Sequence, residues 1–287
     1  MQNLNIDLDG KAILVTGGSM GIGYACAERC LRAGARVTIA ARGADDLRAA
    51  ERRLSAVGEV VARPTDVSEA AQVQSTVAGI VDRYGALDGV IHAAGVYGPI
   101  GRVVDVDPCE WLDAVRINLF GTLLVAREAS RVMVRQPGGG RIVLFSGGGA
   151  AAPFPHYSAY ASGKAGVVRL AETLAQELAG DGVEVNCVSP GFVLTRLHEQ
   201  TVAAGGRAGG FLDETRRQIA AGGVPAAVGA EAAAFLVSDA AHGITGKFVA
   251  APYDGWSTWI DRLDVLKQTD VFTLRRIVPR DRGMDWQ

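Results

Sequence analysis

The sequence predicts a doubly wound α/β protein, in which one parallel sheet is covered by helices on both faces. Short apolar runs alternate with segments of helical periodicity along most of the 287 residues. The first apolar run leads directly into a glycine-rich turn and a helix, and no linker or internal repeat divides the chain. Strands of a parallel sheet are apolar at nearly every position because both of their faces are buried, and helical crossovers join them.

The composition argues against several classes of protein. Lys and Arg number 29 against 31 Asp and Glu, so no nucleic-acid partner is expected. The first residues, MQNLNIDLDG, lack the basic start and apolar run of a signal peptide. No apolar stretch approaches the ~18 residues of a membrane helix. We therefore expect a soluble, cytoplasmic protein without a membrane partner.

The four cysteines predict neither a metal site nor disulfides. Cys26, Cys30, Cys109 and Cys187 are scattered among apolar neighbours, with no CxxC pair and no nearby histidine. Buried free thiols in a reducing compartment are the better interpretation. We expect no metal.

The first element is a strand over Lys11–Thr16, followed by the turn GGSMGIG and a helix over Tyr24–Ala33. Gly17, Gly21 and Gly23 leave room for a tight turn and for a phosphate to approach the backbone. The helix that follows offers free N–H groups and the positive end of its dipole to an anion. This arrangement predicts a dinucleotide-binding site.

The second strand, Ala35–Ala41, ends beside Arg42. In dinucleotide folds an acidic residue at this place holds the ribose 2′-hydroxyl, whereas an arginine accommodates a 2′-phosphate. Because Ala41 occupies the acidic place and Arg42 follows it, the sequence favours NADP over NAD. Arg42 could instead be only a solvated charge at the end of the strand.

Asp66 follows the third strand and has two interpretations. Its carboxylate could accept a hydrogen bond from an adenine amino group, or Asp66 or Ser68 could cap the next helix. The elements around it are a helix at Asp46–Val57, a strand at Glu59–Arg63, a helix at Glu69–Tyr84 and a strand at Gly89–His92.

A second group of candidate residues lies in the middle of the chain. Asn118 interrupts a long helical segment, Glu110–Arg131, as either a buried amide or a site residue. After a strand at Ile142–Phe145, Tyr160 and Lys164 stand one helical turn apart and can point into one pocket. A nearby cation lowers the pKa of a phenol, so the pair could act as a general acid and base near neutrality.

The remaining elements complete one domain, residues 1–251, and a tail. We expect the tail, residues 252–287, to pack on the body or on a neighbouring subunit because it carries three tryptophans. Small residues fill the segment 195–223, which is typical of a mobile lid. The last predicted elements are a strand at Val183–Val188, a helix at Ala230–Ser238 and a strand at Lys247–Ala251.

Taken together, several motifs resemble the classical short-chain dehydrogenase/reductase family over roughly residues 8 to 251. The motifs are TGGSMGIG at Thr16–Gly23, Asp66, Ala94-Gly95, Asn118, Tyr160-x-x-x-Lys164 and Pro190-Gly191-x-x-x-Thr195. The resemblance implies a Rossmann-type sheet of about seven strands and hydride transfer between a nicotinamide cofactor and an alcohol or carbonyl. It also implies a homo-oligomer, either a tetramer or a dimer.

The resemblance also implies a role for each matching residue. Tyr160 would be the acid and base at the substrate oxygen, Lys164 would hold the nicotinamide ribose, and Asn118 would position a water. The other residues expected to contact the cofactor are Gly17, Ser19, Met20, Gly21, Ile22, Gly23, Arg42, Asp66, Val67, Ala94, Gly95, Val193 and Thr195.

The chain departs from the family pattern at two places. The family often has Asn-Ala-Gly where this chain has Ala93-Ala94-Gly95. The place of the catalytic serine holds Gly147, and Ser146 lies one residue earlier. Neighbouring residues of an extended segment point to opposite faces, so Ser146 could be catalytic only if the glycine-rich loop is rearranged. Otherwise a backbone N–H, a water or another side chain, such as His156, Tyr157 or Ser158, would have to polarise the substrate oxygen.

The sequence therefore predicts an NADP-preferring oxidoreductase of a secondary alcohol or ketone, with NAD also possible. Gly147 at the place of the catalytic serine removes one hydrogen-bond donor to the substrate oxygen, and such a loss typically slows turnover by ~100- to 1000-fold. An alternative is consequently a cofactor-binding sensor or a non-catalytic subunit. Retention of Tyr160, Lys164 and Asn118 argues for the enzyme.

Overall fold

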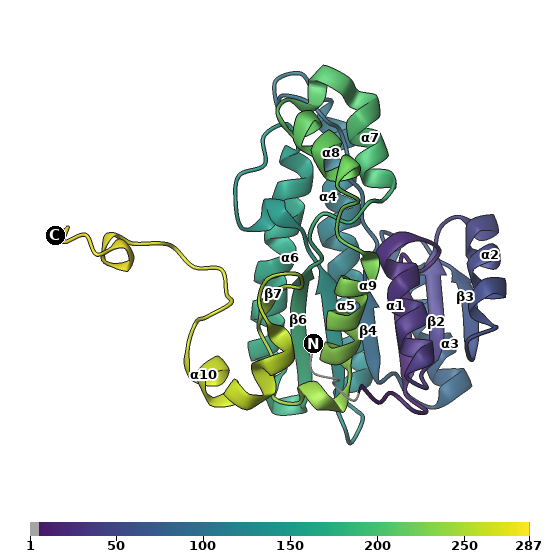
Figure 1. Ribbon diagram of the computed structural model, residues 1–287. Coiled ribbons are helices and arrows are strands. Elements are labelled where there is room, and N and C mark those ends of the chain that lie inside the picture. The colour runs from purple at the N-terminus through teal and green to yellow at the C-terminus, as the bar shows by residue number, and fades with distance from the viewer. Residues whose placement is uncertain (1–5, 287) are drawn as a thin grey trace.

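A computed structural model describes residues 6–286, and its centre is a seven-stranded parallel sheet (Figure 1). The spatial order is β3-β2-β1-β4-β5-β6-β7, and all six neighbouring pairs are parallel. The doubly wound fold predicted from the sequence is confirmed. The strands are β1 (Ala12–Thr16), β2 (Arg36–Ala41), β3 (Val60–Pro64), β4 (Gly89–His92), β5 (Gly140–Phe145), β6 (Val183–Ser189) and β7 (Phe248–Ala250).

Helices cover both faces of the sheet, each over its own hydrophobic cluster. Alternate residues of a strand point to opposite faces. Ile13 and Val15 of β1 accordingly belong to one cluster, whereas Ala12 and Leu14 belong to the other. One face carries α1 (Gly21–Arg32), α2 (Ala44–Leu54) and α9 (Ala226–Val237); the other carries α3 (Ala70–Tyr84), α5 (Gly121–Met133) and α6 (Ser158–Glu177).

The interruption predicted around Asn118 is a short π-helix, Arg116–Phe120, between α4 (Pro108–Val115) and α5. A π-turn inserts an extra residue into a helix and frequently marks a functional position. Asn118 is fully buried there, so its amide is held inside the fold.

The chain reverses its winding direction between β1 and β4, which are neighbours in the sheet. Ligands of open α/β sheets bind at such a switch point, beyond the carboxyl ends of the strands. The lid helices α7 (Arg196–Ala204) and α8 (Phe211–Ala220) stand above this edge (Figure 1).

The tail has two parts, which we name the strap (residues 252–274) and the arm (residues 275–286). The strap runs around the β7 edge of the sheet. Trp256 and Trp259 are buried in the cluster under α9, whereas Leu274 packs on the cluster under α6. Between them, the N–H of Phe248 in β7 donates to the carbonyl of Phe272 at 2.7 Å. The arm extends away from the body, at the left of Figure 1.

None of the helices in the described part of the chain is both long enough and apolar enough to cross a membrane.

Candidate active site

The glycine-rich turn between β1 and α1 is shaped by contacts that exclude side chains. Gly17 has φ +69°, and a Cβ there would lie 2.9 Å from the backbone N of Ala94. A Cβ on Gly23 would lie 2.3 Å from the carbonyl oxygen of Gly17, because α1 starts directly against the turn. Glycine is thus required where the helix N-terminus meets the turn, as a phosphate-binding turn demands.

A cleft of about 1450 Å³ opens over this turn. Its volume and its backbone-lined floor fit a nicotinamide dinucleotide, and the lid helix α7 forms its opposite wall. Nearly all of the residues expected to contact the cofactor line the cleft: Gly17, Ser19, Met20, Gly21, Ile22, Gly23, Arg42, Asp66, Val67, Ala94, Gly95 and Thr195. Val193, Tyr160 and Lys164, which were also expected to contact the cofactor, are buried and lie outside this lining.

Arg42 and Asp66 lie at the adenosine end of the cleft. The Asp66 carboxylate accepts hydrogen bonds from the backbone N (2.9 Å) and Oγ (2.7 Å) of Ser68, so it closes the turn before α3. The pKa of Asp66 lies below its ordinary value. Partial burial alone would raise it, but the two Ser68 hydrogen bonds and the nearby Arg42 stabilise the charged carboxylate by more. No ion pair of Arg42 is found within residues 6–286.

The lid is tied to the body across the cleft. Arg196, the first residue of α7, lies 3.4 Å from the carboxylate of Asp46 in α2. Both side chains are substantially exposed, so this ion pair contributes little stability and can open readily.

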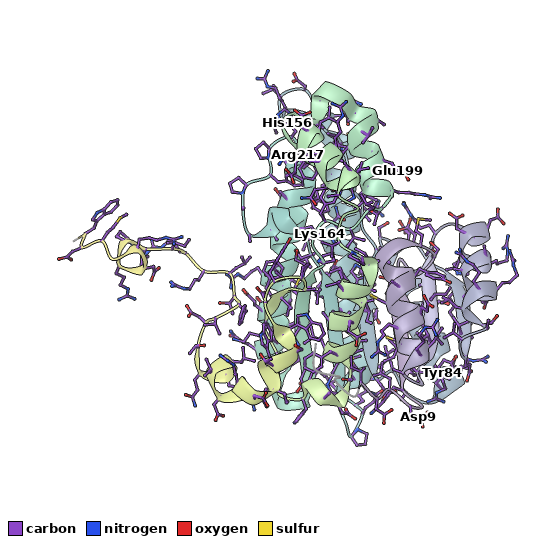
Figure 2. The ribbon with its side chains drawn as sticks, viewed as in Figure 1. Asp9, Tyr84, His156, Lys164, Glu199 and Arg217 are labelled. Atoms are coloured by element: carbon purple, nitrogen blue, oxygen red, sulfur yellow. The ribbon has the colours of Figure 1, made fainter. Side chains whose placement is uncertain are left out.

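Lys164 and Asn118 converge behind the carboxyl end of β4. A Cβ on Gly95 would lie 2.9 Å from Oδ1 of Asn118 and 3.3 Å from Nζ of Lys164, so glycine at this position allows the two to meet. The Asn118 amide is fixed because Oδ1 accepts from the N of Val96 (3.0 Å) and Nδ2 donates to its carbonyl (2.8 Å). Figure 2 shows Lys164 near the centre of the molecule, below the lid that carries Glu199 and Arg217.

The charge state of Tyr160 differs from the sequence-based expectation. Burial raises the pKa of Tyr160 to about 12, and burial lowers the pKa of Lys164 to about 8. The Lys164 ammonium donates to the carbonyl of Phe145 at 2.8 Å and lies 5.9 Å from the centre of the Tyr160 ring. The expected lowering of the phenol pKa is therefore absent in this arrangement, and the phenol is neutral.

Gly147 faces Tyr160, and Ser146 does not. Gly147 is extended (φ −165°), and a Cβ built there would lie 2.4 Å from the Tyr160 hydroxyl oxygen. The side chain of Ser146 leaves the chain on the opposite side, where its Oγ donates to the carbonyl of Lys164 at 3.1 Å. The glycine-rich loop is not rearranged in the way that a catalytic Ser146 would require.

Of the three other candidate donors, Tyr157 and Ser158 are engaged in hydrogen bonds that pack the loop. The Tyr157 hydroxyl donates to Oγ1 of Thr201 at 2.9 Å, which ties the loop to the lid. Oγ of Ser158 accepts from the indole Nε1 of Trp111 at 3.0 Å. His156 has φ +70°, and its buried Nδ1 has no partner among residues 6–286.

Tyr97 and His198 complete the substrate side, and the sequence analysis missed Tyr97. The Tyr97 ring packs edge-on against Tyr160, with 4.9 Å between ring centres. Its hydroxyl lies 3.3 Å from Nε2 of His198 in α7, and burial lowers the pKa of His198 to about 4, so the imidazole is neutral. Phe154 and Phe211 pack on the same cluster, so the lid is closed over Tyr160.

His92, at the end of β4, was also missed. Its Nδ1 lies 2.8 Å from Oγ1 of Thr16 at the end of β1. Burial lowers the pKa of His92 to about 3. The neutral imidazole therefore joins the two strands at the switch point, just before the Ala93-Ala94-Gly95 turn.

Comparisons with known proteins agree with this geometry. Residues 17–252 match a family model described as enoyl-(acyl carrier protein) reductase. D-threitol dehydrogenase of Mycolicibacterium smegmatis is 34% identical over 252 residues, which cover 85% of this chain and 94% of that protein.

Two solved structures have the same fold. NAD+-bound xylitol dehydrogenase is 25% identical with a TM-score of 0.79, and the match covers 85% of this chain and 98% of that one. A variant of actinorhodin polyketide ketoreductase with NADPH is 29% identical with a TM-score of 0.78, covering 86% and 96%. One neighbour thus binds NAD+ and the other NADPH. The chain belongs to the classical short-chain dehydrogenase/reductase family and is an NAD(P)-dependent oxidoreductase of alcohols and ketones.

Proposed function

We propose that this enzyme prefers NADPH and that it reduces a ketone of modest size to a secondary alcohol. The observation that carries the cofactor preference is Arg42, which lines the cleft at the end of β2 and makes no ion pair within residues 6–286. A guanidinium in this place can bind a 2′-phosphate by two parallel hydrogen bonds. Ala41 occupies the position at the end of β2 where an acidic residue would hold the ribose 2′-hydroxyl, so no carboxylate there would repel the 2′-phosphate.

Tyr160 is the proposed proton donor. Burial keeps its phenol neutral at physiological pH, so the phenol can give a proton to the substrate oxygen as that oxygen gains charge. This supports the direction of carbonyl reduction. When bound, the nicotinamide cofactor supplies the hydride.

Lys164 and Asn118 are proposed to serve Tyr160. The Lys164 ammonium, with a pKa of about 8, is mostly charged at neutral pH and would hold the hydroxyls of the nicotinamide ribose. Asn118, fixed on Val96, would position the water from which the phenol regains its proton. Ser146 donates a hydrogen bond to the carbonyl of Lys164, so it would position α6 and would not touch the substrate.

The substrate space is proposed to be lined by the aromatic cluster of Tyr97, Phe154 and Phe211, which supports an apolar substrate body. Tyr97 and His198 supply the polar pair in this cluster. With Gly147 in place of the serine, their hydrogen-bonding groups are the proposed means of orienting the substrate oxygen.

We also propose that the enzyme is a homo-oligomer in the cytoplasm. Leu112, Phe120 and Leu123 expose apolar side chains on α4, the π-helix and α5, as a subunit interface would. All four cysteines are free thiols, and three of them are buried, which suits a reducing compartment.

The test is a fluorescence titration with NADPH and with NADH, followed by turnover assays on a panel of ketones. We expect tighter binding of NADPH and a loss of about tenfold, or ~1.4 kcal/mol, in Arg42→Ala. Arg48→Ala, on the exposed face of α2, is the matched control and should bind NADPH normally. Equal binding of the two cofactors would contradict the preference. Tight binding without turnover of any ketone would favour the sensor alternative.

A further inference from the structure

The ion pair between Arg196 and Asp46 bridges the cofactor cleft. Arg196 opens the lid helix α7, whereas Asp46 lies in the first turn of α2, and both residues line the cleft. The start of α7 lies against the glycine-rich turn, since a Cβ on Gly21 would lie 3.4 Å from Cγ2 of Thr195. The side chain of Arg196 therefore reaches from the turn after β1 to the start of α2.

This bridge ends beside Arg42. The oxygen of Asp46 that faces Arg196 is Oδ2, and it would lie 3.8 Å from a Cβ built on Gly43. Gly43 directly follows Arg42 in the chain. An arginine in the position of Arg42 accommodates a 2′-phosphate in dinucleotide folds. The bridge therefore brings a second guanidinium to the place where that phosphate is expected.

We propose that Arg196 is a second arginine for the 2′-phosphate of the cofactor, and that Asp46 holds it in place until the phosphate binds. The inference rests on the proposed preference for NADPH. The side chain of Arg196 is 64% exposed and that of Asp46 50%, so their ion pair is screened by solvent. A phosphate can accept two parallel hydrogen bonds from a guanidinium and carries more charge than a carboxylate, so it is the stronger partner.

Asp46 is the carboxylate of α2 that competes with the phosphate. Its neighbour Asp45 is paired with Arg48 and lies outside the lining of the cleft. Asp46 should weaken phosphate binding in two ways, because it holds Arg196 and because its own charge repels the phosphate. Removing this carboxylate should therefore strengthen binding of the phosphate. An ion pair that served only the structure of the lid would give no such gain.

A phosphate on Arg196 would also restrain the substrate side. His198 follows Arg196 by two residues on α7, and its Nε2 lies 3.3 Å from the Tyr97 hydroxyl. Tyr97 in turn packs edge-on against Tyr160. Holding the first residue of α7 consequently limits the movement of His198 over the site. The 2′-phosphate thus both selects the cofactor and steadies the lid.

Calorimetric titration with two cofactor fragments tests the proposal without turnover. Adenosine 2′,5′-bisphosphate carries the 2′-phosphate, whereas 5′-AMP lacks it. Arg196→Gln should lower the affinity for the bisphosphate about tenfold and leave the affinity for 5′-AMP unchanged. Asp46→Asn should raise the affinity for the bisphosphate about two- to fivefold, which is the range that an exposed ion pair supplies.

Arg216→Gln is the matched control. Arg216 is an exposed arginine of the lid that pairs with Asp213 at 3.5 Å, outside the lining of the cleft, so both affinities should stay unchanged. Trypsin gives a second readout, because Arg207 is exposed in the glycine-rich segment GGRAGG of the lid. The bisphosphate should slow cleavage after Arg207 more than 5′-AMP does, and this difference should disappear in Arg196→Gln.

The outcomes distinguish this inference from the proposed function on which it rests. If the natural protein binds the two fragments equally, the preference for NADPH is wrong and the role of Arg196 falls with it. If Arg42→Ala loses affinity for the bisphosphate while Arg196→Gln binds it normally, the preference stands and Arg196 has no part in it. Equal losses for both fragments in a normally folded Arg196→Gln would also overturn the proposal, because Arg196 would then not recognise the 2′-phosphate.

Discussion

The cofactor cleft and the substrate side of the active site differ in what they are made of. The cleft is floored by glycines and backbone around the turn after β1, and it is open, with about 1450 Å³ of space. The substrate side is made of aromatic side chains from distant segments, such as Tyr97, Tyr160 and Phe211, and it is closed. A cavity shaped by backbone is present before its ligand arrives, whereas side chains and a lid must move to admit one.

This contrast predicts that substitutions in the two regions have different effects. A side chain added in the cleft clashes with backbone atoms that cannot shift, so it should weaken cofactor binding. A change on the substrate side meets side chains that can shift, so it should act on turnover. Each of the following predictions tests that separation.

The largest effect is expected for Tyr160→Phe. Removing the proton donor should lower kcat by ~100- to 10,000-fold, while the phenyl ring keeps the aromatic contacts. The dissociation constant of NADPH should remain unchanged in a fluorescence titration. Tyr157→Phe, which loses only the hydrogen bond to Thr201, is the control and should retain most of the activity. A Tyr160→Phe enzyme with nearly natural turnover would remove Tyr160 from the chemistry.

Gly23→Ala should weaken cofactor binding. Its methyl group would meet the carbonyl oxygen of Gly17 at 2.3 Å, and backbone on both sides leaves no room to relax. We expect the affinity for NADPH to fall ~10- to 100-fold, which corresponds to the usual cost of overpacking. Gly180→Ala, where a Cβ meets nothing within 4 Å, is the matched control. An unaltered affinity in Gly23→Ala would show that the turn is not rigid.

Gly147→Ala should act on turnover instead. The added Cβ lies 2.4 Å from the Tyr160 hydroxyl, which must move aside, and a displaced proton donor should slow kcat by about tenfold. Gly148→Ala adds the same group in the same loop, where nothing lies within 4 Å, and should behave like the natural enzyme. If both variants lowered cofactor affinity and left kcat intact, the two sides of the site would not be separable.

Burial of His92 makes the free energy of unfolding depend on pH. The folded pKa of about 3 lies below the ordinary value of 6.5, so between these values the unfolded chain binds the proton and the folded chain does not. Stability should therefore fall as the pH drops through this window, by up to ~1.4 kcal/mol per pH unit from this group.

Urea unfolding at pH 6 and pH 5 measures this effect. His92→Asn, which keeps a hydrogen-bonding partner for Thr16, should lose about 1 kcal/mol less than the natural chain over that interval. His198 titrates in the same direction and remains in the variant, so some acid sensitivity should persist. Equal losses in the two proteins would mean that His92 is protonated in the folded state.

The sequence was sufficient for the elements that depend on local constraints. The strand predicted at Lys11–Thr16 is β1, Ala12–Thr16, and the helix predicted at Glu69–Tyr84 is α3, Ala70–Tyr84. The glycine-rich turn could be interpreted because its glycines satisfy backbone requirements that few other residues meet, as at Gly17 with φ +69°.

The substrate side depends on contacts that no local pattern reports. Tyr97 and His198 are 101 residues apart, and they meet only because the lid folds back over the sheet edge. The signal that was available is the position of Tyr97, directly after the Ala94-Gly95 turn. The raised pKa of Tyr160 could not be predicted from the sequence either, because it is caused by burial, which only the folded structure reveals.

The strap has a consequence for chains that end early. β7 is the last strand of the sheet, yet Phe272, whose carbonyl accepts from Phe248 of β7, follows it by more than twenty residues. A released chain that ends before Phe272 leaves β7 as an open strand edge, and open edges template pairing between chains. Chains truncated within the strap should therefore aggregate, whereas chains that lack only the arm should not.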